Sequence, residues 1–123
     1  MSRFYCAPME LEKTLRHYKP RFVPALPGRT NHRHSAVVIP LCWDDGLHAV
    51  ATLRPQHLGN HGGEVCFPGG KPEPLDESLE ATGLRELWEE LGMRPNDVLG
   101  QLSSIPLYTS DFRITPFVIR VED

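Results

Sequence analysis

The chain has 123 residues, of which 40% are hydrophobic and 24% are charged, with 13 Lys and Arg against 16 Asp and Glu. This length and composition indicate one small globular domain and exclude a disordered chain, a collagen-like protein and a long coiled coil. No apolar run approaches the roughly 20 residues that span a bilayer, and the N-terminus lacks the apolar core of a signal peptide. We therefore expect a soluble intracellular protein, located in the cytoplasm or in an organellar matrix, with no membrane partner.

The net charge of -3 conceals two segments of opposite charge. Residues 1–34 hold seven basic and two acidic side chains, a balance of +5, whereas residues 71–90 hold seven acidic and two basic side chains, a balance of -5. The acidic cluster is either a solvated helix face or a cation site. The basic segment is interpreted as a solvated arm, because no aromatic-interleaved motif in it indicates a nucleic-acid partner.

The first predicted element is a helix over residues 8–18, where apolar side chains recur with rough helical periodicity. Residues 19–34 contain three prolines, a glycine and four basic residues, and have no usable period. We interpret this segment as a connector or a mobile arm.

Two strands are predicted next. The segment Ala36–Trp43 is rich in β-branched residues and predicts a buried strand, in which Pro40 favours an edge position or a bulge. The turn residues Asp44–Gly46 follow, and they lead into an alternating strand at Leu47–Leu53. The two strands are therefore expected to form an antiparallel hairpin.

Residues 54–76 are rich in glycine and proline and predict a long loop, which in a compact domain usually has a function. A helix is predicted over Glu77–Leu91, with Gly92 as its left-handed terminator. Two further strands are predicted at Val98–Ile105 and Ile114–Val121.

Three carboxylates share one face of the predicted second helix. At about 100° per residue, Glu86, Glu89 and Glu90 fall together, while leucines and Trp88 form an adjoining apolar face that is expected to be buried. Like charges at this spacing repel one another. Hard divalent cations such as Mg²⁺ or Mn²⁺ prefer oxygen ligands, so this face is either a cation site or a solvated acidic surface.

The loop before this helix contains Phe67–Pro68–Gly69–Gly70. Consecutive glycines allow backbone amides and carbonyls to approach a ligand or a metal closely, although the same residues also form ordinary turns. Upstream, Arg54 ends a predicted strand and has the planar fork of donors that suits a phosphate contact.

Together these residues resemble the Nudix hydrolase signature, which is a glycine, five residues, Glu, seven residues, then Arg-Glu-aliphatic-any-Glu-Glu-any-Gly-aliphatic. Gly70 stands one residue too early for the first glycine, so the loop has one extra residue. The positions that match in spacing are Glu77, Arg85, Glu86, Leu87, Glu89, Glu90, Gly92 and Met93.

The loop is similar in its length to the coenzyme A diphosphatase branch of this family. Pro55 and Gly59 depart from the Ser and Arg that are usual in that branch. The positions that are similar to it are Arg54, Leu58, His61, Gly63, Val65 and the segment Phe67–Gly70.

The resemblance implies an α/β fold, namely the Nudix α/β/α sandwich with a mixed sheet. Residues 1–34 would then be an N-terminal helix and a basic Pro-rich arm, and residues 35–123 the Nudix domain. Because 123 residues are short for this family, the chain is either a fragment or a compact variant.

The resemblance also implies roles for the site residues. Glu86, Glu89, Glu90 and the carbonyl of Gly70 would bind Mg²⁺ or Mn²⁺, and Glu89 or Glu90 would be the general base. Arg85 would orient the catalytic glutamates or the loop, and Glu77 would support it as its partner. The substrate contacts would be Arg54, Gly69 and Gly70.

The implied activity is hydrolysis of the diphosphate of coenzyme A or acyl-coenzyme A to 3′,5′-ADP and (acyl-)phosphopantetheine. A second interpretation keeps this chemistry but changes the substrate to ADP-ribose, a dinucleotide or a nucleoside triphosphate. A third is a domain that binds a nucleotide without cleaving it. In each case the partner is a small nucleotide. The oligomeric state stays open, with a homodimer as one alternative.

Overall fold

The computed structural model of the chain describes residues 8–53 and 63–122. The elements of its N-terminal half are α1 (Pro8–His17), β1 (Arg33–Trp43), β2 (Leu47–Ala49), β3 (Thr52–Leu53), β4 (Val65–Cys66) and β5 (Gly69–Gly70). Those of the C-terminal half are α2 (Leu79–Leu91), β6 (Asp97–Gln101), β7 (Ile105–Pro106) and β8 (Phe112–Arg120).

A six-stranded mixed sheet forms the middle of the molecule, with strand order β2-β1-β8-β6. The strands β1 and β8 are parallel, in register from Arg33 opposite Phe112 to Leu41 opposite Arg120. All other pairings are antiparallel, with β5 and β2 on β1 and with β7 and β6 on β8. The mixed α/β architecture expected from the sequence is therefore confirmed.

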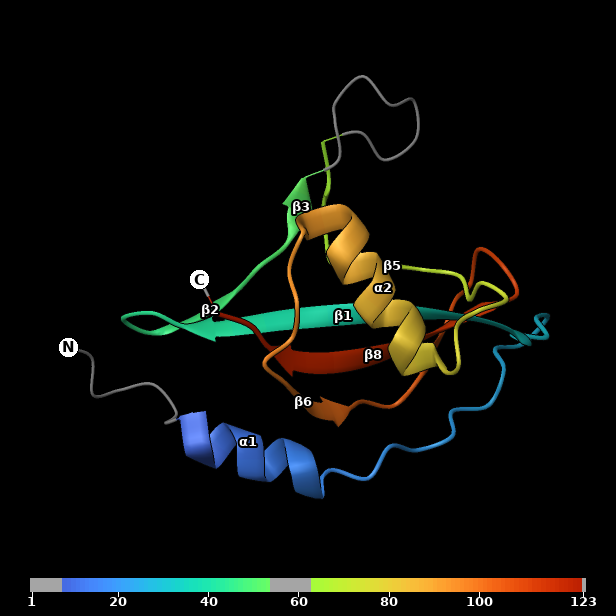
Figure 1. Ribbon diagram of the computed structural model, residues 1–123. Helices are drawn as coiled ribbons and strands as arrows, with labels where there is room; N and C mark the ends of the chain where they lie inside the picture. Colours follow the sequence, from blue (N-terminus) through green and yellow to red (C-terminus); the bar gives the residue numbers. More distant parts are fainter. Residues whose placement is uncertain (1–7, 54–62, 123) are drawn as a thin grey trace.

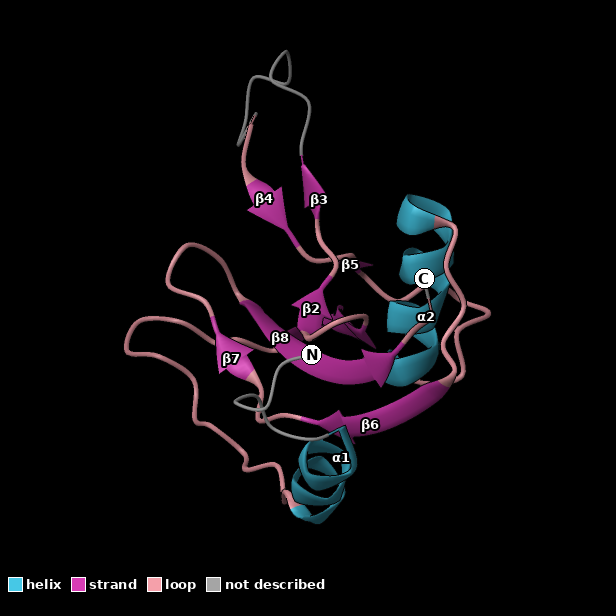
Figure 2. Ribbon diagram, turned by 90° about the vertical axis from the view of Figure 1, so that its left-hand side faces the viewer, coloured by secondary structure: helices cyan, strands magenta, loops and turns pink. Residues whose placement is uncertain are grey.

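The helix α2 packs across β1 and β5, and α1 lies against β6, away from α2 (Figures 1 and 2). Every second residue of β1 is buried, beginning at Ala36, because alternate side chains of a strand point to the same face. The core cluster consists of Val38, Cys42, Leu87, Ile119 and Val121. Its position shows that the sheet and α2 share one apolar interface.

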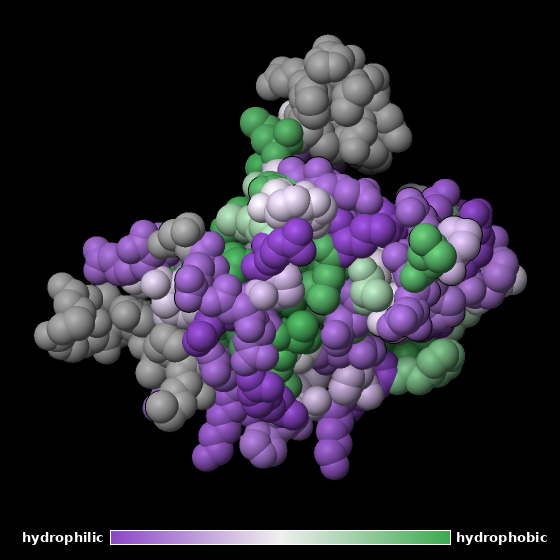
Figure 3. Space-filling model, viewed as in Figure 1, coloured by the Kyte–Doolittle hydropathy of each residue, from purple (hydrophilic) through white to green (hydrophobic). Residues whose placement is uncertain are grey.

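The surface on the α2 side is mostly hydrophilic, with hydrophobic residues visible near its centre (Figure 3). The apolar face of α2 is buried at Leu87, whereas Trp88 remains 50% exposed beneath the guanidinium of Arg94. The expected burial of Trp88 is therefore wrong, because this side chain lies beside the core-facing row of the helix. No helix in the described part of the chain has the length and hydropathy to cross a membrane.

Local signals set both ends of α2. The Ser78 hydroxyl accepts a hydrogen bond from the amide of Ala81, so the helix begins at Leu79, two residues after the predicted start. At the other end, Gly92 adopts φ 65° and donates its amide to the Trp88 carbonyl. The predicted glycine terminator is confirmed, and the first helix also ends within one residue of its predicted end.

The predicted hairpin is only partly correct. The Asp44–Gly46 turn is present and β2 pairs antiparallel with β1, but only over three residues. The chain then leaves the sheet at Val50, and β3 pairs with β4 in a separate two-stranded ribbon that projects from the body (Figure 2). The predicted strand Val98–Ile105 is likewise divided between β6 and β7.

Pro40 lies inside the sheet and not at its edge. The amide of Val38 donates to the Pro68 carbonyl on the β5 side, so the nitrogen of Pro40, two residues later, faces the same side. There the partner of β1 changes from β5 to β2, and the Pro40 carbonyl accepts the amide of Val50. Proline has no amide hydrogen to donate, and this missing donor lies where the partner of β1 changes from β5 to β2. A central strand therefore tolerates this proline.

The segment between α1 and β1 is held against the body. Asn31 is buried, accepts the Leu26 amide, and donates to the carbonyls of Leu107 and Phe112. The buried guanidinium of Arg113 donates to the carbonyl of Val23 at 2.6 Å. This part of the predicted arm is therefore a connector fixed by polar contacts, and not a mobile arm.

The first prediction concerns the core. The side chain of Leu87 is fully buried, so Leu87→Ala should lower the free energy of unfolding by about 2–5 kcal/mol through lost burial and a residual cavity. Leu75 is 94% exposed, and Leu75→Ala should change it by less than about 0.5 kcal/mol. Urea denaturation measures both; equal effects would contradict the described packing of α2.

Candidate active site

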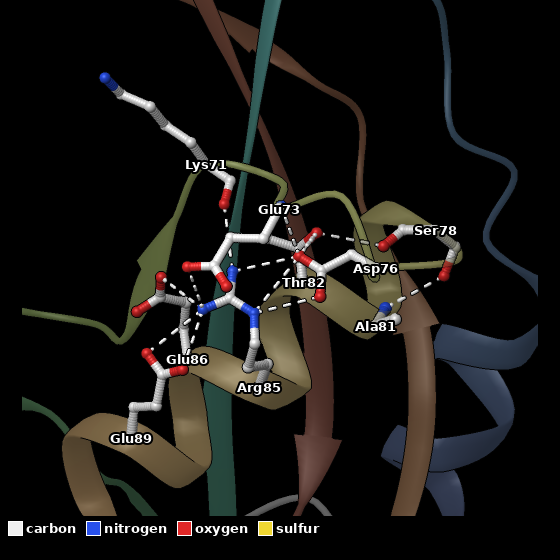
Figure 4. A network of polar contacts seen from close by, with 9 residues as sticks. All are labelled: Lys71, Glu73, Asp76, Ser78, Ala81, Thr82, Arg85, Glu86 and Glu89. Carbon is white, nitrogen blue, oxygen red and sulfur yellow. Dashed lines mark hydrogen bonds and ion pairs between the residues drawn. The ribbon is translucent and has the colours of Figure 1, made fainter.

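Arg85 lies at the centre of a polar network between α2 and the loop that precedes it (Figure 4). Its Nε donates to Oδ1 of Asp76 at 3.1 Å, and its Nη2 donates to Oδ2 of the same carboxylate at 3.1 Å. Nη2 also donates to the carbonyl of Lys71 at 3.1 Å. This bidentate pairing fastens the loop to the helix.

The remaining nitrogen of Arg85, Nη1, faces three further carboxylates. It donates to Oε2 of Glu89 at 3.0 Å and lies 3.4 Å from Oε2 of Glu86. Oε2 of Glu73 lies 3.3 Å from it. One guanidinium thus balances part of the negative charge that the sequence concentrates in residues 71–90. Its hydrogen bonds to Asp76, and next those to Glu89, raise the pKa of Arg85.

Asp76 is the principal partner of Arg85. Its side chain is 7% exposed and also accepts hydrogen bonds from the amide of Glu73 and the hydroxyl of Thr82. The bonds from Arg85, followed by the backbone bond from Glu73, lower the pKa of the Asp76 carboxyl to about 2. This carboxylate therefore stays charged over most of the pH range.

The expected pairing of Arg85 with Glu77 is wrong. Because Ser78 caps the helix, Glu77 precedes α2 and is exposed, while Asp76 is turned inward. The sequence holds a signal for this that was missed, since Asp76 follows Gly70 after the five intervening residues of the signature. The extra residue thus lies between the acid and Arg85, and not between the glycine and the acid.

Glu86 and Glu90 lie against the backbone of β5. Oε2 of Glu90 accepts the amide of Gly69 at 3.0 Å. A Cβ atom at Gly70 would lie 2.7 Å from Cδ of Glu86, so a side chain at this position would displace the carboxylate. Burial raises the pKa of Glu86, Arg85 opposes that change, and the nearby charges of Glu90 and Glu89 add to it.

The donor set fits a hard cation in chemistry but is incomplete in this arrangement. Two carboxylates that repel each other stand beside a glycine backbone, and such oxygens suit Mg²⁺ or Mn²⁺, which retain several waters. Glu89 points to Arg85 instead (Figure 4). Accordingly, no three His, Cys, Asp or Glu side chains within residues 8–53 and 63–122 are arranged to hold a metal ion.

The structure thus brings Arg85, Glu86, Glu90, Gly69 and Gly70 together, and Glu89 joins them through Arg85. Arg54, the candidate phosphate contact, lies outside the described residues, as do Leu58 and His61.

Comparison with known proteins identifies the family. The family model of the NUDIX domain matches residues 32–120. The chain belongs to the Nudix family. It is 42% identical over 95 residues to the uncharacterized Nudix hydrolase NudL of Yersinia enterocolitica, covering 76% of this chain and 48% of that protein.

A second relative is Nudix hydrolase 3 of Caenorhabditis elegans, with 42% identity over 91 residues, 72% of this chain and 38% of that protein. The Nudix chain described here therefore spans about half or less of these relatives' lengths. Nudix hydrolases generally use divalent metal ions.

Solved structures confirm the Nudix fold. The Nudix hydrolase RenU of M. smegmatis superimposes with a TM-score of 0.59 at 15% identity, covering 74% of this chain and 62% of that one. The NUDIX domain of Shewanella oneidensis NrtR, solved in complex with ADP ribose, gives a TM-score of 0.53 at 22% identity, covering 90% and 69%.

The second prediction tests the Arg85 partner. Because the folded pKa of Asp76 is about 2, below its ordinary 3.8, its contribution to stability is present above about pH 4 and is lost as pH falls through about 2. Asp76→Asn should therefore lower stability at pH 7 and flatten its decline between about pH 4 and 2. Glu77→Gln should do neither. Denaturation curves at several pH values measure the free energy of unfolding of both variants. The same pH dependence in the two variants would contradict the assignment of Asp76 as the partner of Arg85.

Proposed function

We propose that this chain is a metal-dependent Nudix diphosphatase that hydrolyses the diphosphate of coenzyme A or its thioesters to 3′,5′-ADP and (acyl-)phosphopantetheine. The observation that carries the proposal is the position of Glu86 and Glu90 against the glycine backbone of β5. This arrangement gathers two carboxylates at one point, and a divalent cation there would offset their mutual repulsion.

The acidic cluster alone would repel a diphosphate, which is itself strongly anionic. Glu86 and Glu90 would hold Mg²⁺ or Mn²⁺, together with the carbonyl of Gly70 and with Glu89 once it leaves Arg85. When bound, the cation supplies neutralisation of phosphate oxygens and an activated water.

The residues of the chain then divide the remaining tasks. Glu89 or Glu90 accepts the proton of the attacking water at a carboxylate oxygen. Arg85 is a positioning residue, because its bonds to Asp76 and Lys71 fix the loop relative to the glutamates of α2. Gly69 holds the carboxylate of Glu90 through its amide.

The choice of coenzyme A rests on the residues before α2. Gly63 and the segment Phe67–Gly70 agree with the pattern of the coenzyme A branch, and Val65 is similar to it. ADP ribose is the ligand named for the NrtR domain, whose likeness to this chain is one of fold. A substrate panel separates the two.

The third prediction is the activity itself. With Mg²⁺ or Mn²⁺, incubation with coenzyme A, ADP-ribose, NADH, diadenosine polyphosphates and dNTPs should release 3′,5′-ADP and phosphopantetheine from coenzyme A, as identified by mass. Glu86→Gln and Glu90→Gln should each lower kcat by about 100-fold or more. Glu80→Gln, on the exposed first turn of the same helix, is the matched control. Preference for ADP-ribose would contradict the coenzyme A assignment. If Glu86→Gln and Glu90→Gln kept the wild-type kcat, the proposed cation site would be wrong.

The fourth prediction addresses the glycine backbone. In Gly70→Ala the new Cβ would displace the carboxylate of Glu86, so the affinity for Mn²⁺ should fall by about 10-fold to 100-fold. Electron paramagnetic resonance of free Mn²⁺ measures this without substrate. Thermal unfolding checks that the fold is retained, and an unchanged affinity in a folded Gly70→Ala protein would show that this carboxylate is not a ligand.

A further inference from the structure

A cavity of about 340 Å³ lies beside β5, across this strand from the carboxylates described above. The backbones of Gly69 and Gly70 form part of its wall, and the same two residues contact Glu90 and Glu86. The rest of the wall is largely apolar, formed by Val37, Phe67, Leu107, Phe112 and Ile114. A molecule bound at the carboxylates would therefore lie close to this open cavity.

Two cations lie against the ring of Phe112, which forms part of the cavity wall. The guanidinium of Arg33 lies 4.5 Å from the centre of the Phe112 ring, and the ammonium of Lys71 lies 5.3 Å from it. These cation–π contacts hold both charges near Phe112 without neutralising them. Neither side chain pairs with a carboxylate within the part of the chain that the structure describes.

Lys71 connects the cavity with the Arg85 network. Its carbonyl accepts the bond from Arg85, while its side chain extends away from the carboxylates (Figure 4). The register of the sheet places Arg33 of β1 opposite Phe112 of β8, so the second cation approaches from a different strand. Both cations therefore lie against a ring that forms part of the cavity wall.

We propose that this cavity receives the nucleoside end of the substrate, and that Arg33 and Lys71 bind a phosphate monoester on its sugar. The inference rests on the proposed diphosphatase function and identifies which substrates that site prefers. Apolar and aromatic walls suit the faces of a planar base. A phosphate monoester carries close to two negative charges and three acceptor oxygens, which suit a guanidinium and an ammonium.

Other occupants fit the cavity less well. An acyl chain would match the apolar wall but would leave two cations without a counter-charge. The diphosphate is served by the cation site on the other side of β5. A nucleoside with a phosphate monoester on its sugar would contact the apolar wall through its base and the two cations through its phosphate. Arg33 and Lys71 would then be specificity-determining residues.

The fifth prediction compares two substrates that differ only in this phosphate, coenzyme A and dephospho-coenzyme A. The wild type should prefer coenzyme A, and Arg33→Gln and Lys71→Gln should each lower the ratio of the two kcat/KM values by about tenfold or more, chiefly through KM. Arg94→Gln is the matched control, because it removes an arginine that lies 4.3 Å above the ring of Trp88, outside the cavity. The control should keep the wild-type ratio.

Two kinetic outcomes would overturn the inference. Equal losses on both substrates would mean that the cations act on the diphosphate, and a wild type without preference would mean that the phosphate monoester is not recognised. Hydrolysis of both substrates at equal rates would leave the diphosphatase function standing while rejecting the role of the cavity.

Binding measured without turnover tests the cavity assignment independently of the proposed diphosphatase activity. Calorimetry with 3′,5′-ADP and 5′-AMP should show tighter binding of 3′,5′-ADP, and Lys71→Gln should remove the difference. If the wild type shows this preference but hydrolyses nothing in the panel, the cavity assignment stands and the proposed activity fails. If it binds both nucleotides equally, or neither, the cavity assignment fails.

Discussion

The pairing of Arg85 with Asp76 is the interaction on which the arrangement of the site depends. The loop before α2 has little regular structure to fix it, and this pair joins it to the helix through parallel hydrogen bonds at 3.1 Å. The same guanidinium reaches the carbonyl of Lys71 and the carboxylate of Glu89. A single side chain therefore joins the loop that follows β5 to the acidic face of α2.

Features governed by short-range chemistry could be predicted from the sequence. The ends of α2 depend on Ser78 and Gly92, which act through their own turns, and the acidic face follows from helical periodicity alone. Features that depend on distant segments could not be predicted as well. The chain leaves β1 after Ala49 because β3 pairs with β4, which lies beyond residues 54–62, and no local pattern indicates that partner.

The partner of Arg85 illustrates the same limit within the site. Spacing from the arginine selects Glu77, and spacing from Gly70 selects Asp76; both residues are acidic and adjacent. Only the cap at Ser78 decides which one faces inward, because it fixes where the helix starts. Trp88 shows a comparable ambiguity, because it lies at the edge of the apolar face of α2. Whether such a residue is buried depends on how far the sheet extends beneath the helix.

The parallel pairing of β1 with β8 has a consequence for how the molecule forms. Paired residues of these strands are 79 positions apart in the sequence, as Arg33 and Phe112 are, and β8 contributes the buried residues Phe117, Val118 and Ile119. Contacts of such large sequence separation form slowly, because a long loop must close before they stabilise anything. During synthesis, the edge of β1 that pairs with β8 stays unpaired until residues 112–120 have left the ribosome, so the nascent sheet closes only after β8 is available.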